Sequence, residues 1–130
     1  MSKTLPPMSE LAQPFFDGAS KGELRLQQCR SCSKHQFYPR TICSHCSGGE
    51  LDWTTASGDG VIASFTVVRR AVSAAYEAPY VVALIDLVEG PRMMSALIDV
   101  DPEAVTIGQA VTVAFAEWSD SISMPVFKLV

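Results

Sequence analysis

The four cysteines are the residues whose type and spacing point most directly to chemistry. They form two Cys-x-x-Cys pairs, Cys29/Cys32 and Cys43/Cys46, separated by a ten-residue spacer. One tight turn can present both thiolates of such a pair to the same ion, and two turns complete a tetrahedral shell. Because all four positions are then filled by thiolate and none is left for a catalytic water, the spacing predicts a structural zinc site.

Three other uses of these cysteines are weighed against zinc. Iron stays open as a less favoured choice, because thiolate ligation alone does not separate it from zinc. Two disulfides suit an exported protein, and the N-terminus has no apolar stretch typical of a signal peptide. A redox pair is expected to open a helix after a strand, which is not the pattern here. The histidines, His35 and His45, lie in the same segment and neither is expected to be catalytic; His45, inside the second pair, is expected to be an exposed turn residue rather than a ligand.

Charge is divided unevenly along the chain. Residues 1–47 carry six bases and three acids, whereas residues 48–130 carry four bases and eleven acids. Nucleic-acid surfaces need clustered Lys and Arg, so the acidic half argues against DNA or RNA as a partner. No apolar run approaches the ~20 residues that cross a bilayer. We therefore expect a cytoplasmic protein without a membrane span.

The elements that must position the cysteines are mostly strands. Residues 14–21 predict a short helix, followed by strands at 23–28, 36–39 and 51–54 around the two cysteine turns. Five further strands are predicted at 61–70, 80–88, 92–100, 110–118 and 124–130, with a helical turn at 101–105. The expected fold class is mainly β: an N-terminal arm and helix (1–22), a four-cysteine zinc ribbon (23–57) and a five-stranded OB-type barrel (58–130).

The chain resembles the family catalogued as domain of unknown function 35 in several short motifs and in their order. The motifs include Pro14 to Gly18, Gly22 to Leu26, both cysteine turns and Ala78 to Leu84. The resemblance implies a rubredoxin-like zinc ribbon joined to an OB-fold. Members often have glycine directly after each Cys-x-x-Cys, where this chain has Ser33 and Ser47. That departure predicts slightly strained turns without the loss of a ligand.

No active site is recognisable in the sequence itself. Gly18-x-Ser20-x-Gly22 matches the nucleophile elbow of hydrolases, but a helix is expected before the serine and a strand after it, the reverse of that motif. The family resemblance implies instead an accessory subunit, whose partner is a thiolase-like enzyme, retro-aldolase or acyltransferase that brings the catalytic residues. The resemblance also implies that acyl-CoA is held with that partner.

Six residues outside the metal site are candidates for ligand or partner contacts. Arg69 and Arg70 end the first barrel strand and Arg92 begins the third, so convergence at one rim is a candidate, while solvated strand ends are the favoured interpretation. Tyr76 lies in the loop 71–79, which is expected to be mobile. Phe15 and Phe16 are expected to pack on the ribbon or to anchor a subunit interface.

The leading hypothesis is a non-catalytic zinc-ribbon and OB-fold subunit that binds a thiolase-like partner and helps hold acyl-CoA. The alternative is a nucleic-acid-binding module, because zinc ribbons and OB-folds often bind DNA or RNA. A third possibility is an enzyme that acts on acyl-CoA alone.

Overall fold

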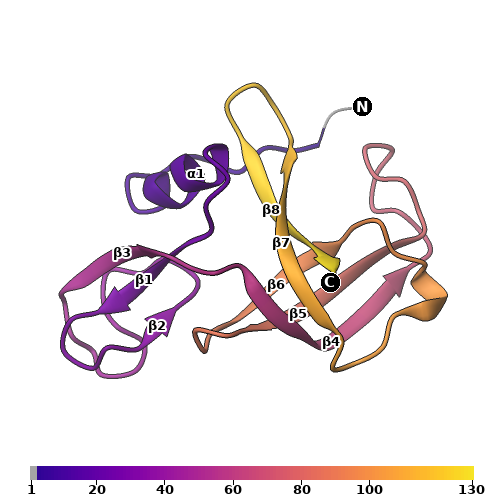
Figure 1. Ribbon diagram of the computed structural model, residues 1–130. Coiled ribbons are helices and arrows are strands. Elements are labelled where there is room, and N and C mark those ends of the chain that lie inside the picture. Colours follow the sequence, from indigo (N-terminus) through magenta and orange to yellow (C-terminus); the bar gives the residue numbers. More distant parts are fainter. Residues whose placement is uncertain (1–2) are drawn as a thin grey trace.

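The computed structural model describes residues 3–130, which form a small sheet beside a closed barrel (Figure 1). The elements follow the order α1 (Gln13–Ser20), β1 (Arg25–Cys29), β2 (His35–Gln36), β3 (Leu51–Thr55), β4 (Asp59–Val68), β5 (Tyr80–Leu87), β6 (Arg92–Leu97), the 3-10 turn η1 (Pro102–Ala104), β7 (Ala110–Glu117) and β8 (Ser123–Leu129). The predicted fold class is thereby confirmed. Among the described residues, no helix is long and apolar enough to cross a membrane.

Helix α1 is fixed by residues at both of its ends. Pro14 stands in the first turn, where its missing N–H costs nothing. After the last turn Gly22 takes a φ of 75°, a left-handed conformation that favours glycine, and its N–H bonds to the carbonyl of Ala19 at 3.1 Å. The aromatic side chains of Phe15 and Phe16 on this helix are buried.

The small sheet, in the order β2-β1-β3, carries the cysteine turns. Strand β1 lies in the middle, antiparallel to both neighbours, with Gln27 opposite Trp53 on one side and Gln36 on the other. The strand predicted at 36–39 is shorter than expected: β2 contains only His35 and Gln36. The next residue, Phe37, leaves the sheet and packs against Phe15 with ring centroids 5.4 Å apart.

The barrel closes in the order β4-β5-β6-β8-β7. Strands β4 and β5 are antiparallel over eight register pairs, and β4 bends at a bulge between Ile62 and Ser64. Strand β5 alternates buried and half-buried residues along its whole length, which is the pattern of a barrel strand with one face inward. The contact of β6 with β8 is parallel and short, with Leu97 opposite Phe127.

Phe127 lies at the centre of the apolar core and is fully buried. The same contiguous core contains Phe15 and Phe16 of α1, Leu24 just before β1, Leu26 in β1, and the inward side chains of the barrel. Burial of one such large side chain contributes roughly 2–3 kcal/mol relative to exposure. Because one core joins the helix, the small sheet and the barrel, the turns that carry the cysteines are anchored to the barrel.

Candidate metal centre and barrel crevices

The two cysteine turns have the same hydrogen-bond pattern. In the first turn, the Cys29 N–H donates to the Lys34 carbonyl (3.0 Å) and the Ser33 N–H donates to the Cys29 carbonyl (2.9 Å). The second turn repeats both bonds, from Cys43 to Gly48 (2.8 Å) and from Ser47 to Cys43 (3.0 Å). Two matching turns therefore present their thiols toward a common point.

The four sulfur atoms have the spacing of a tetrahedral metal shell. All four lie within 4.8 Å of one another, with Cys29 Sγ 3.5 Å from Cys46 Sγ and Cys32 Sγ 3.6 Å from Cys43 Sγ. A tetrahedral zinc–thiolate site with bonds of about 2.3 Å has sulfurs about 3.8 Å apart, close to these distances. Cys29 and Cys43 are buried, and Cys46 is exposed. The donor set and its size therefore fit a metal ion with four sulfur ligands.

The electrostatics of the cluster also favour a cation. Backbone N–H groups of Cys32 and Ser31 lower the pKa of Cys29 to about 6. The Gly48 N–H acts to lower the pKa of Cys46, but the neighbouring Cys29 sulfur, partial desolvation of the thiol and the Cys32 and Cys43 sulfurs outweigh it and raise that pKa to about 12. Four adjacent thiols cannot all ionise without a compensating positive charge, which a bound divalent metal supplies.

Two buried glutamines hold the turns in place, and the sequence analysis did not single them out. Gln36 donates from Nε2 to Gln27 Oε1 at 2.6 Å, and its own Oε1 accepts the Ser44 N–H at 2.8 Å. Gln27 Oε1 also accepts the Arg40 N–H at 2.9 Å. Both glutamines are only 3% exposed. The signal in the sequence is their place at inward positions of β1 and β2, where a polar residue must find internal partners.

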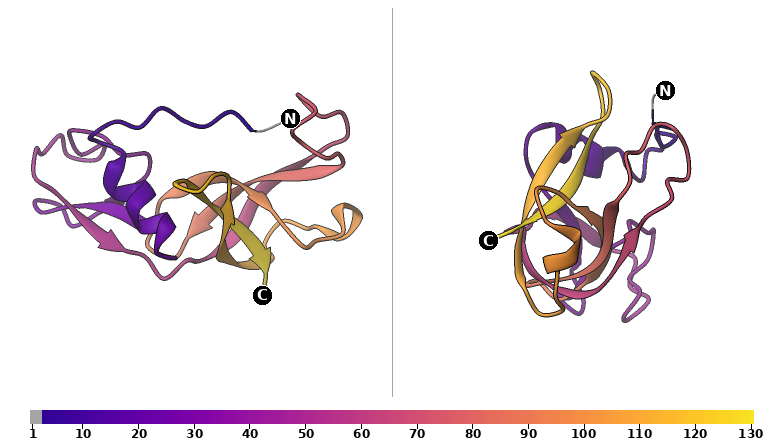
Figure 2. Two further views of the ribbon diagram at one scale, coloured as in Figure 1. Left: turned by 90° about the horizontal axis from the view of Figure 1, so that it is seen from above. Right: turned by 90° about the vertical axis from the view of Figure 1, so that its right-hand side faces the viewer.

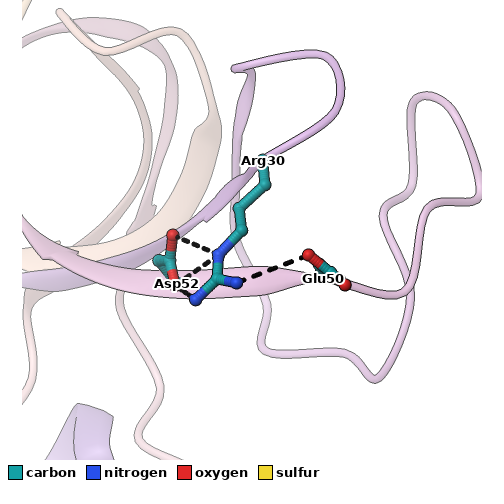
Figure 3. Close-up of polar contacts among 3 residues, drawn as sticks. All are labelled: Arg30, Glu50 and Asp52. Atoms are coloured by element: carbon teal, nitrogen blue, oxygen red, sulfur yellow. Dashed lines mark hydrogen bonds and ion pairs between the residues drawn. The ribbon is translucent and has the colours of Figure 1, made fainter.

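An ion pair outside the cluster fastens the first turn to β3. Arg30 donates from Nε and Nη2 to both carboxylate oxygens of Asp52, at 2.8–3.0 Å, and from Nη1 to Glu50 at 3.4 Å (Figure 3). The hydrogen bond from Arg30 holds the pKa of Asp52 below its usual range. The guanidinium thus has a structural role and is not available to a ligand.

Among residues 3–130, neither the two histidines nor Ser20 belongs to a metal cluster or to a nucleophile elbow. The sulfur cluster includes neither histidine; His45 instead has its Nε2 3.2 Å from the His35 carbonyl. Ser20 is the last residue of α1, so a helix precedes it, as the sequence predicted. This arrangement is the reverse of a nucleophile elbow.

The three arginines do not converge at one rim, so the less favoured of the two interpretations was wrong. Arg69 and Arg70 follow the end of β4, which pairs with the start of β5 at Tyr80, whereas Arg92 lies opposite Asp86 near the far end of β5. Strand length therefore separates them by roughly 20 Å. Arg92 is paired with Asp86 and Arg69 with Glu103, as expected of solvated strand ends.

A large apolar crevice of about 580 Å³ lies between the loop 71–79 and the end of the β7–β8 hairpin. We call it the Tyr76 crevice. Tyr76 packs there against Tyr80 with ring centroids 5.7 Å apart. Its lining is formed by Lys3, Val72, Tyr76, Glu77, Tyr80, Val82, Met94, Ser95, Ala96, Leu97, Ile98, Ala116, Glu117, Trp118 and Val126.

A second crevice of about 360 Å³ lies where the helix, the small sheet and the barrel meet. Its lining is formed by Pro6, Pro7, Ala12, Phe15, Phe16, Phe37, Tyr38, Pro39, Met93, Met94, Met124 and Pro125. The structure therefore places Phe15 and Phe16 on the ribbon side of the core, at the wall of this crevice. Met94, 57% exposed, borders both crevices.

Two family descriptions match adjacent parts of the chain. The profile described as "ChsH2, rubredoxin-like zinc ribbon domain" matches residues 16–52, and that described as "ChsH2, C-terminal OB-fold domain" matches residues 53–116. Over 96% of its length the chain superimposes on 98% of a chain in a solved structure described as "Ltp2-ChsH2(DUF35) aldolase", with a TM-score of 0.88 and 30% identity.

Two curated relatives differ in length. A probable enoyl-CoA hydratase alpha subunit of Thermomonospora curvata is 34% identical over 88% of this chain, which spans only about a third (36%) of that protein. A DUF35 domain-containing scaffold protein of Methanothermobacter thermautotrophicus is 37% identical over 83% of each chain. On these matches, the chain belongs to the DUF35 family, with the ribbon and OB-fold arrangement of ChsH2.

Proposed function

We propose that the chain is a non-catalytic subunit with a structural zinc ion, which binds a thiolase-like enzyme, retro-aldolase or acyltransferase and helps hold its acyl-CoA substrate. The observation that carries this proposal is the similarity, over nearly the full length of both chains, to a component of a solved aldolase whose description names two proteins. The word "scaffold" in the description of the Methanothermobacter relative supports the same assignment.

Zinc in particular is supported by the geometry of the cluster. Cys29, Cys32, Cys43 and Cys46 would be its ligands, because their sulfurs fit a closed four-coordinate shell. Such a shell has no open position, so the ion would stabilise the ribbon rather than bind substrate. Iron can occupy the same ligands and remains the less favoured choice.

The proposal that the chain is not itself catalytic is supported by the surroundings of its carboxylates. Within residues 3–130, the carboxylates with lowered pKa values are surface partners of arginine or hydroxyl groups: Glu23, Asp52 and Asp86. None of the three faces a histidine or a candidate nucleophile. General acid–base chemistry needs such a pairing, and an enzyme partner would supply it.

The nucleic-acid alternative is disfavoured by the charge of the barrel face. OB-folds bind oligonucleotides over the second and third barrel strands and the loops beside them. Those positions here form the Tyr76 crevice, which contains the carboxylates of Glu77 and Glu117 and one amine, from Lys3. A phosphate backbone would meet net negative charge there.

The proposal is tested by isolating the tagged protein at its native expression level and identifying what accompanies it by mass spectrometry. Stoichiometric recovery of a thiolase-fold enzyme, retro-aldolase or acyltransferase is expected, together with a complex stabilised by added acyl-CoA. Recovery of nucleic acid or ribosomal material would contradict the proposal. Turnover of acyl-CoA by the purified single chain would contradict the non-catalytic assignment.

A further inference from the structure

The Tyr76 crevice combines aromatic rings with carboxylates. Tyr76, Tyr80 and Trp118 line it together with Glu77 and Glu117, and most of the remaining wall is aliphatic. Within the described part of the chain, neither glutamate forms an ion pair. Aromatic faces and carboxylates both attract cations, and an apolar wall favours a cation that is attached to an apolar body.

A cation of this chain already occupies part of the crevice. The Lys3 ammonium lies 5.1 Å from the centre of the Tyr76 ring and donates a hydrogen bond to the Ala75 carbonyl at 3.3 Å. These are contacts that a lysine from another protein could make in the same place. Lys3 therefore shows which chemistry the crevice accepts.

The segment that carries Lys3 is held weakly. Residues 3–9 form no helix or strand, and they run across the barrel from the second crevice, which Pro6 and Pro7 line, to the loop 71–79 (Figure 2, left). Leu5 and Met8 in this segment remain 41% and 42% exposed. A segment with so little buried apolar surface costs little free energy to displace.

We infer that the Tyr76 crevice docks an apolar segment of the enzyme partner through a lysine or arginine of that segment, and that Lys3 holds this place in the free chain. The inference rests on the proposed function for the existence of the partner and adds the surface and the charge that recognise it. The carboxylates of Glu77 and Glu117 favour an occupant with a positive charge. The phosphates of CoA would be repelled by Glu77 and Glu117, so the crevice suits a protein segment and not the nucleotide part of the substrate.

The first test needs no partner, because the two tryptophans report on different regions. Trp118 lines the crevice, whereas Trp53 lies in β3 of the small sheet. The full chain with Lys3→Glu, which removes the competing amine, is titrated with a blocked peptide of residues 1–12. A matched peptide contains Glu in place of the lysine. The indole N–H resonances of both tryptophans are followed by NMR.

The lysine peptide is expected to shift the Trp118 resonance saturably and to leave that of Trp53 unchanged. The glutamate peptide is expected to shift neither resonance. Replacing Glu77 or Glu117 by Gln should weaken binding of the lysine peptide about threefold, in line with one exposed charge contact. Equal shifts with the two peptides, or no shift with either, would overturn the inference.

The second test uses the enzyme that accompanies the tagged protein. Glu77→Lys and Glu117→Lys are expected to reduce its recovery at least about tenfold when combined. Asp59→Lys is the matched control, since Asp59 is exposed at the start of β4 and does not line the crevice. Full recovery with the double variant would overturn the docking surface and leave the proposed function standing. If no enzyme accompanies the unmodified chain, the proposed function fails and the docking inference with it, whatever the peptide shows.

Discussion

The side chains of Gln27 and Gln36 face each other at 2.6 Å beneath the cysteine turns, each almost completely buried. Gln27 belongs to β1, which leads into the first cysteine turn, and Gln36 belongs to β2, which follows that turn. The hydrogen bond between the two side chains therefore joins these two strands. Their remaining bonds go to backbone groups of the 40–44 segment. The pair thus replaces an apolar core beneath the candidate metal centre and connects the two turns.

Gln27→Met should destabilise the metal-loaded chain by about 2–3 kcal/mol, because it leaves the N–H and the carbonyl of Arg40 without their side-chain partner and removes the stronger of the two acceptors of the Gln36 amide. The measurement is the free energy of unfolding from urea titration. Gln28→Met is the matched control: Gln28 is the next residue on β1, is half-buried, and donates only to the Ser33 carbonyl at 3.0 Å. A smaller loss for Gln27→Met than for the control would contradict the role of the buried pair.

Replacing the serines that follow the cysteine pairs should stabilise the ribbon. Ser33 and Ser47 have φ values of 64° and 65°, a left-handed conformation that costs a non-glycine residue energy. Glycine removes that cost but loses more entropy on folding, so each of Ser33→Gly and Ser47→Gly should gain only about 0.5–1 kcal/mol. Unfolding of the metal-loaded protein checks the gain.

Gly49→Ala is a useful reference for these two variants, because a Cβ at that position meets no atom within 4 Å and its φ is not left-handed. That substitution should raise stability slightly or leave it unchanged, through the unfolded chain. If Ser33→Gly and Ser47→Gly both lower stability, the serine side chains contribute more to the turns than their backbone strain costs.

The sequence predicted the cluster of four cysteines and the order of strands well, because both depend on local spacing. Two Cys-x-x-Cys pairs leave few alternatives, and alternation along residues 80–87 points to one barrel strand whatever surrounds it. The strained serines were also anticipated, from the family's preference for glycine at those positions.

Features that depend on contacts across the fold were missed. In the sequence, Arg70 follows the end of one barrel strand and Arg92 begins another, so both could belong to the same rim. The pairing register shows instead that Arg70 lies near the start of β5 and Arg92 near its end. The Tyr76 crevice is assembled from residues as distant as Lys3 and Val126. No local pattern announces such a site, since its walls come from separate strands and loops.

The Asp86–Arg92 pair on the barrel should give a pH-dependent contribution to stability. Hydrogen bonds from Arg92 lower the folded-state pKa of Asp86, so the pair stabilises the folded chain above the unfolded pKa of aspartate, about 3.9. The contribution is lost as the pH falls through the lower, folded pKa. The stability difference between the unmodified chain and Asp86→Asn should therefore be constant above about pH 5 and should vanish in stronger acid. A stability difference that stays the same from neutral pH into strong acid would show that the ion pair does not cause it.

Removal of one thiol should unfold the small sheet around the metal centre and leave the barrel folded. Cys43→Ala deletes a buried ligand, and a three-thiolate site retains metal poorly, so bound zinc should fall from about one equivalent to near zero by elemental analysis. The Trp53 indole resonance, in the small sheet, should lose its folded position, while that of Trp118 at the barrel should keep its own. Ser44→Ala, the neighbouring residue in the same turn, is the control and should retain the metal. Full metal content in Cys43→Ala would contradict four-sulfur ligation, and iron in place of zinc in the unmodified protein would correct the identity of the ion without changing its ligands.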